Sequence, residues 1–191
     1  MQANIHDALR DSDVFASANH ESTDASPKYE QAILADATDG QGRFFGDDYD
    51  DELKRMARAV LEKEGPIRDD LLTRRIARAH GFARTGGRIK DRVLALLPNV
   101  TVTKESVGNF LWPTDSPPPL IPFRRPHPGD ERRSLDEIPM PELIGLVRSR
   151  PDLAASDDPA IAFAREIGLA RLAKLALERL EEAIERANKL N

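Results

Sequence analysis

The middle of the sequence contains a series of positively charged side chains that could bind phosphate groups. A guanidinium group donates paired hydrogen bonds to phosphate oxygens, and a lysine ammonium contributes a point charge. The residues that we expect to make such contacts are Arg74, Arg78, Arg84, Thr85, Arg88, Arg92 and Lys104. This chemistry is noncovalent, so it predicts binding of a polyanion.

Charge is distributed unevenly along the chain. Residues 1–52 have 3 Lys and Arg against 13 Asp and Glu, residues 53–112 have 13 against 6, and residues 113–191 have 12 against 14. The middle segment is therefore the only basic one, although the net charge of the chain is −5. A basic segment beside an acidic one is typical of polyanion binding, and the alternative is a surplus of arginine on solvated helix faces.

The sequence contains no motif for catalysis or for metal binding. It has no Gly-x-x-x-x-Gly-Lys-Ser/Thr loop for ATP, no Gly-x-Ser-x-Gly elbow and no His-Glu-x-x-His. Cysteine is absent, and the four histidines are far apart in sequence. The acidic run from Asp47 to Glu52 suits the start of a helix better than a magnesium site. We therefore expect no enzymatic activity, no catalytic residue, no cofactor and no metal.

The elements that would position the basic residues are predicted at residues 48–113. Apolar residues at helical spacing predict three helices, at residues 53–64, 69–81 and 85–97. Alternating β-branched residues and turn residues then predict a two-stranded hairpin at residues 100–112. Three helices followed by a hairpin are the order of a winged helix, a form of helix-turn-helix unit whose third helix enters the DNA major groove.

Within this predicted unit, Arg84, Thr85 and Arg88 would lie at the leading end of the third helix. Asp91 projects opposite the apolar stripe of the same helix, so it would face the groove and oppose sequence-specific reading. We expect contacts to the DNA backbone or to DNA structure instead. Trp112 is expected to pack the hairpin against the helices, with stacking on a base as the alternative.

The remaining sequence is predicted to contain an arm, a linker and a second unit. Residues 1–47 are acidic and largely without periodicity, apart from a short helix predicted at Tyr29–Ala37. Residues 114–134 form a proline-rich linker, and residues 135–191 are predicted to be helical. The fold class that we predict is mainly α with a small two-stranded β wing, a winged-helix-like unit followed by a second helical unit. No apolar run suits a membrane span or a secretory signal, so we expect a cytoplasmic protein with no membrane partner.

A short internal repeat links the two units. Residues 75–84 and 162–171 match at an offset of 87 positions, and both segments contain Ala-Arg, a glycine and a final Ala-Arg. We therefore predict that residues 135–191 are a partial repeat of the first unit without the wing. An apolar series in the last helix suits packing within this chain, and a dimer seam or a surface for a parent protein is the alternative.

Several short motifs together resemble a known family. They are Glu64-Gly-Pro-Ile67, Arg75-Ile-Ala-Arg78, Gly81-Phe-Ala-Arg84, Phe110-Leu-Trp-Pro113 and Glu137-Ile-Pro139. They are similar to an uncharacterised domain, a domain-of-unknown-function family, at the C-terminal end of large bacterial superfamily-one helicase-related proteins. The resemblance covers roughly residues 45–191. It implies an accessory unit that follows a helicase core and a nuclease-like domain, and it implies no catalytic residue.

The sequence thus favours a non-catalytic, DNA-binding accessory module of a helicase- or nuclease-type assembly. Its expected partners are DNA, bound with weak sequence specificity, and a helicase-type protein or parent polypeptide. The alternative is a protein–protein docking domain that uses the winged helix or the C-terminal helices.

Overall fold

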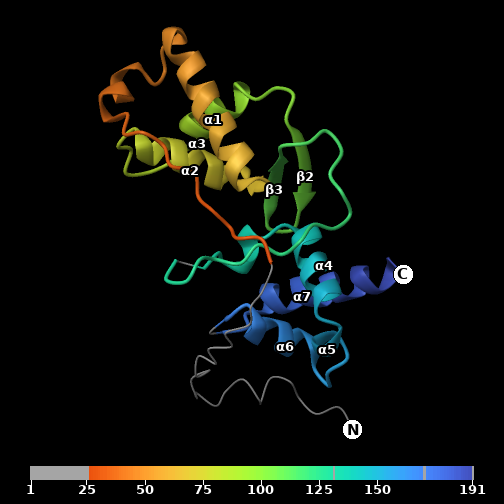
Figure 1. The fold of residues 1–191 in the computed structure, drawn as a ribbon. Helices are drawn as coiled ribbons and strands as arrows, with labels where there is room; N and C mark the ends of the chain where they lie inside the picture. Colours follow the sequence, from red (N-terminus) through yellow and green to blue (C-terminus); the bar gives the residue numbers. More distant parts are fainter. Residues whose placement is uncertain (1–25, 131, 170, 191) are drawn as a thin grey trace. The chain divides into compact units, whose positions relative to one another are not determined.

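The computed structural model describes residues 26–130, 132–169 and 171–190 (Figure 1). The chain divides into a first unit of residues 26–146 and a second unit that begins at residue 147. The expected fold class, mainly α with a small β part, is confirmed. Among the helices of these described ranges, none is both long and apolar enough to cross a membrane.

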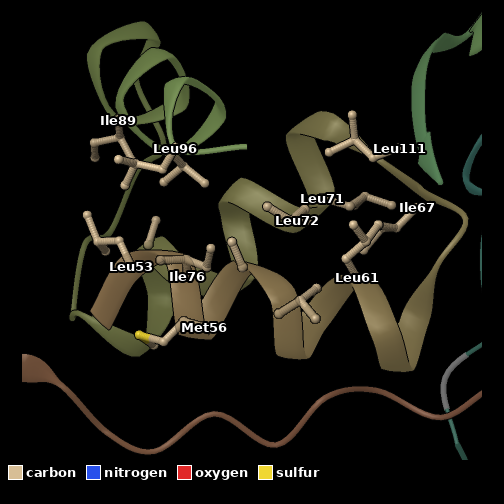
Figure 2. Packing of buried hydrophobic residues seen from close by; sticks show 14 of the residues in the cluster. Leu53, Met56, Leu61, Ile67, Leu71, Leu72, Ile76, Ile89, Leu96 and Leu111 are labelled. Carbon is tan, nitrogen blue, oxygen red and sulfur yellow. The ribbon is translucent and has the colours of Figure 1, made fainter. Parts of the chain in front are cut away.

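Three helices form the core of the first unit: α1 (Asp50–Glu64), α2 (Asp69–Ala79) and α3 (Gly87–Ala95). Their apolar residues recur every three or four positions, so each helix has an apolar stripe that faces the other two. Figure 2 shows Ile89 of α3 and Leu96, directly after α3, pointing toward Leu53 of α1. The three predicted helices are therefore present, although α3 is shorter at both ends than the predicted range of 85–97.

A three-stranded antiparallel sheet completes the winged-helix order. Its strands are β1 (Ile67–Arg68), β2 (Thr101–Glu105) and β3 (Gly108–Trp112), in the spatial order β1-β3-β2. The hairpin of β2 and β3 was predicted, whereas β1 was not. A strand of two residues between two helices has too few positions to show an alternating pattern.

Both faces of the sheet contribute buried side chains from β3. Leu111 is paired with Ile67, and both side chains belong to the helical core. Because successive side chains of a strand point to opposite faces, Phe110 and Trp112 lie on the face of the sheet away from this core. They are 0% and 3% exposed. Trp112 is thus a packing residue, but the expectation that it packs the hairpin against the helices is wrong, because alternation along β3 directs it away from them.

The segment at residues 136–140 approaches this second face. Arg68 forms an ion pair with Asp136, and the Met140 backbone N–H donates to Glu105 at 2.9 Å. Both Arg68 and Glu105 lie on the face of Phe110 according to the strand register. The segment includes a 3-10 turn, η3 (Leu135–Glu137), and leads into α4 (Met140–Ser149).

Two extended segments also contribute buried side chains to the first unit. Tyr29 and Phe44 are 8% and 0% exposed, although they belong to the stretch that we predicted as an acidic arm. Phe123 of the proline-rich stretch is buried as well. The helix predicted at Tyr29–Ala37 is absent: this stretch is extended, and 3-10 turns follow at η1 (Thr38–Arg43) and η2 (Asp47–Tyr49).

The second unit is helical, with α5 (Pro151–Ala154), α6 (Pro159–Glu166) and α7 (Lys174–Lys189). Asp158 caps α6 by accepting a hydrogen bond from the Ile161 N–H. Phe163 of α6 and Leu180 of α7 are buried. Part of the apolar series in α7 therefore packs within the described chain.

The two copies of the internal repeat share one local backbone geometry. Gly81 follows α2 with a φ of +74°, and Gly168 follows α6 with a φ of +73°. In both copies the residue after the glycine donates its N–H to the carbonyl five positions earlier. The Phe82 N–H donates to Ala77 at 3.0 Å, and the Leu169 N–H donates to Ala164 at 2.9 Å. Glycine follows each helix because it adopts the left-handed conformation without the steric cost of a Cβ atom.

Candidate nucleic-acid interface

The connection between α2 and α3 forms one side of an open hollow of about 410 Å³, which we name the turn hollow. Gly81 reverses the chain after α2, and Gly86 precedes α3 without any side-chain cap. The N–H groups in the first turn of α3 therefore have no side-chain acceptor at Gly86. Together with the helix dipole, such groups favour a negative charge at this end of the helix.

Four of the seven predicted phosphate-binding residues line the turn hollow. Its described lining consists of Asp70, Arg74, Arg78, Phe82, Ala83, Arg84, Thr85, Gly86, Gly87 and Lys90. The structure thus brings Arg74 and Arg78 of α2 together with Arg84 and Thr85 of the turn, and it adds Lys90 of α3. Four cationic side chains face one carboxylate among these residues, so the hollow is positively charged.

The cations of the turn hollow differ in how far they are already paired. Arg78 and Arg84 are exposed, and neither makes an ion pair with another residue of the described chain. Arg74 lies 3.4 Å from Asp70, a weak contact, while Lys90 lies 2.8 Å from the buried Asp69. Arg78 and Arg84 are therefore the side chains most available to an anion.

The single described carboxylate of the turn hollow is held by a neighbour outside the hollow. Arg68 donates two hydrogen bonds to Asp70, at 2.7 and 2.8 Å. These hydrogen bonds are the main reason that the pKa of Asp70 lies below its ordinary value, against the opposing effect of partial burial. Asp70 is thus ionised at neutral pH, but much of its charge is already compensated by Arg68.

A second hollow of about 220 Å³, which we name the arginine hollow, shares Arg74 and Arg78 with the first. Its described lining consists of Gln31, Leu71, Arg74, Arg75, Arg78, Arg132, Arg133, Ser134 and Glu137. Five arginines and one carboxylate are present in this set. The two hollows together form a continuous basic surface along the exposed side of α2, and we use that name for them below.

Two buried carboxylates form ion pairs with arginines that line the arginine hollow. Arg75 lies 3.2 Å from Glu64, and Arg133 donates to Glu142 at 3.0 Å. Both glutamates have fully buried side chains. Glu64 also accepts a hydrogen bond of 2.6 Å from Tyr29, and burial raises the pKa of the Tyr29 hydroxyl, which therefore remains a donor. These contacts fix the positions of Arg75 and Arg133.

Two of the predicted residues are used elsewhere in the fold. The Arg92 side chain is mostly buried, forms an ion pair with Asp50 and donates to the Gly46 carbonyl at 2.8 Å. The Arg88 guanidinium stacks over the Phe45 ring at 4.0 Å from its centre. Neither residue lines the turn hollow or the arginine hollow. Arg92 stabilises the fold, and Arg88 is exposed on a different side of α3 from Lys90.

The last predicted residue, Lys104, lies on the wing next to the same network. It is exposed and lies opposite Asn109 in the strand register. The Asn109 amide donates to Asp69 at 3.0 Å, and Asp69 also binds Lys90. Directly opposed residues share one face of a sheet, so Lys104 lies on the sheet face that adjoins the turn hollow.

Sequence reasoning missed Lys90, Arg75, Arg132 and Arg133. Arg75 lies on the same exposed face of the predicted second helix as Arg74 and Arg78, but it is not among the predicted phosphate-binding residues. Arg132 and Arg133 lie near the end of the proline-rich linker, more than fifty positions from α2. The only signal in the sequence was their charge, because contacts over such a distance depend on tertiary packing.

Comparison with known proteins gives a family match for part of the first unit. Residues 43–91 match the model of a family described as "Protein of unknown function (DUF3320)". This range includes α1, β1, α2 and the turn that leads into α3. No curated protein and no solved structure matches the chain. The family match supports the resemblance to a domain-of-unknown-function family that the motifs indicated. The matched range contains every described residue that lines the turn hollow.

Proposed function

We propose that this chain is a non-catalytic accessory module that binds DNA through its phosphate backbone, within a helicase- or nuclease-type assembly of the bacterial cytoplasm. The observation that supports the proposal most directly is the turn hollow. Arg74, Arg78, Arg84 and Lys90 gather there beside the N-terminus of α3. Cations and free helix N–H groups at one place are suited to phosphate oxygens.

The arrangement favours backbone binding over reading of bases. Arg92 is engaged by Asp50, and Asp91 is exposed on α3, so the middle of this helix offers few free donors to base edges. The available cations lie along α2 and the turn instead. Contacts of this kind position a protein on nucleic acid without specifying sequence.

The helicase or nuclease context comes from the family resemblance of the sequence. In such an assembly the motor or nuclease would supply the chemistry, and this module would add affinity for the substrate. A module of that kind needs only noncovalent phosphate contacts.

A first prediction tests the role of the basic surface. Full-length chain titrated into a short labelled duplex should bind by fluorescence anisotropy at low salt and more weakly at moderate salt. Arg78→Ala combined with Arg84→Ala should lower the slope of log affinity against log salt by about 2, one unit for each lost phosphate contact.

The matched control is Arg58→Ala, which removes one charge from an exposed site on α1 outside both hollows. Circular dichroism should show that all variants keep the helical content of the wild type. Absence of DNA binding at low salt would overturn the proposal and would favour protein docking instead. Equal salt slopes for the wild type and the double variant would show that the turn hollow is not the site.

A further inference from the structure

We infer that the arginine hollow binds a phosphomonoester, specifically the phosphorylated end of a nucleic-acid strand whose backbone lies in the turn hollow. This inference rests on the proposed function and adds the class of DNA end that the module prefers. It follows from four properties of the arginine hollow: rigid donors, charge, size and position.

The donors at the base of the hollow are held in place before any ligand binds. The Arg75 and Arg133 side chains are 22% and 8% exposed. Each is paired with a fully buried glutamate, so little conformational entropy remains to be lost when an anion arrives. Arg74, Arg78 and Arg132 surround this base with more mobile side chains that can adjust to the ligand.

The charge of the hollow suits a doubly charged anion. Its described lining has five arginines and one carboxylate, and the buried glutamates compensate two of these arginines. A phosphodiester inside a strand carries one negative charge. A phosphomonoester carries about −1.5 to −2 at neutral pH and offers three strong acceptor oxygens. A terminal phosphomonoester therefore forms stronger hydrogen bonds and ion pairs with the same guanidinium donors than a phosphodiester does.

The size of the hollow suits a phosphate group better than a whole nucleotide. Its volume of about 220 Å³ lies below the roughly 300–1,000 Å³ that is typical of small-molecule sites. Among the residues described, no aromatic side chain lines it, so the aromatic platform on which single-stranded bases usually stack is missing from this lining. The group that enters is then the phosphate itself.

The position of the hollow points to the end of a strand. It shares Arg74 and Arg78 with the larger turn hollow, so a backbone bound by the turn hollow passes directly beside it. A strand that continued through the smaller hollow would have to place sugar and base there as well. A strand that stops at its terminal phosphate avoids this.

The test uses the full-length chain and three otherwise identical labelled single strands, with a 5′-phosphate, a 3′-phosphate or no terminal phosphate. We expect one of the phosphorylated strands to bind about tenfold more tightly than the strand with hydroxyl ends, a change typical of one added hydrogen bond to a charged group. Inorganic phosphate at millimolar concentration should remove this advantage by occupying the arginine hollow.

Two variants separate this inference from the proposed function. Arg132→Ala removes an exposed side chain that lines only the arginine hollow, and it should abolish the end preference while the hydroxyl-ended strand binds as before. Arg84→Ala alters only the turn hollow and should weaken all three strands alike. Gln31→Glu, which adds a carboxylate to the lining of the arginine hollow, should act like Arg132→Ala.

Equal affinity for the three strands overturns the inference and leaves the proposed function standing. An end preference that survives both Arg132→Ala and Gln31→Glu overturns it too, because the phosphate would then bind elsewhere. Failure of every single strand to bind while the labelled duplex still binds would overturn the inference alone. Failure of the duplex to bind at low salt would remove the proposed function as well.

Discussion

Glu142 shows how a buried charge positions the basic surface. Its carboxylate is fully buried and accepts hydrogen bonds from Arg133 and from Arg124, at 3.0 and 2.8 Å. Burial alone would raise the pKa of Glu142, but the hydrogen bonds and charges of the two arginines outweigh it and leave the pKa below its ordinary value. The carboxylate thus stays ionised, and it holds Arg133 at the base of the arginine hollow.

Replacement of this carboxylate should destabilise the first unit. We expect Glu142→Gln to lower the free energy of unfolding by about 3–5 kcal/mol at neutral pH, because two arginines remain buried without their counter-charge. Urea unfolding followed by Trp112 fluorescence measures this, since Trp112 is the single tryptophan of the chain and is 3% exposed. Glu62→Gln, at an exposed position of α1, is the control and should be neutral.

The same carboxylate predicts a pH dependence of stability. The pKa of Glu142 is lower in the folded than in the unfolded state, so its ionised form stabilises the fold at any pH above the pKa of the unfolded state. This contribution to stability is lost as the pH falls toward the pKa of the folded state. The wild type should therefore lose stability below the ordinary glutamate pKa of about 4.3. Glu142→Gln should lose less over the same range, and an identical acid dependence of the two proteins would contradict the assignment.

At the level of single residues, the sequence shows where the arginines are concentrated but not which of them form ion pairs in the fold. Arg92 and Arg84 were both predicted to bind phosphate, yet only Arg92 forms an ion pair with a carboxylate, Asp50, within the described chain. That partner lies 42 positions away, and helical periodicity contains no information about such a distance. Arg132 and Arg133 were missed for the same reason.

At the level of elements, the turn between α2 and α3 depends on Gly81. Its φ of +74° is in the left-handed region, and a Cβ atom there would lie 3.1 Å from the Thr38 methyl carbon. Residues with a side chain are strained in this conformation by about 1–2 kcal/mol. The backbone path of the turn that lines the turn hollow therefore depends on a glycine at position 81.

Gly81→Ala should lower the free energy of unfolding by about 1–2 kcal/mol and the Tm by a few degrees. Thermal unfolding followed by circular dichroism measures the change. Gly87→Ala is the matched control: this glycine lies in α3 with open space around its Cα, so alanine there should be neutral or stabilising. Similar losses of stability in both variants would show that the left-handed turn is not the cause.

Elements with strong periodicity were predictable, and those without it were not. The stripes of α1, α2 and α3 repeat at helical spacing over several turns, so their positions followed from the sequence. The strand β1 has two residues, and the stretch around Tyr29 is held by contacts to Glu64 and to the Arg125 backbone. Such segments take their structure from distant partners, which is why the predicted helix at Tyr29–Ala37 is absent.

At the level of the whole molecule, the chain combines a basic surface with an acidic N-terminal sequence. Residues 1–25 contain one arginine against five Asp and Glu, whereas residues 53–112 have 13 Lys and Arg against 6 Asp and Glu. Negative charges on the same chain as a polyanion site repel the polyanion over distances up to the Debye length, about 10 Å at 0.1 M salt. This repulsion requires no fixed contact between the acidic residues and the basic surface.

Removal of residues 1–25 should therefore strengthen DNA binding at low salt by about two- to threefold, with a smaller difference at moderate salt, because repulsion between exposed charges is screened. Fluorescence anisotropy of the full and shortened chains with the same duplex measures the effect. A full-length variant in which Asp7, Asp11, Asp13, Glu21 and Asp24 become the corresponding amides separates charge from length. It should bind at least as tightly as the shortened chain, because both lose the same five carboxylates and the variant keeps Arg10. Weaker binding by either protein would mean that the acidic sequence assists the interaction, and the electrostatic argument would then be wrong for this chain.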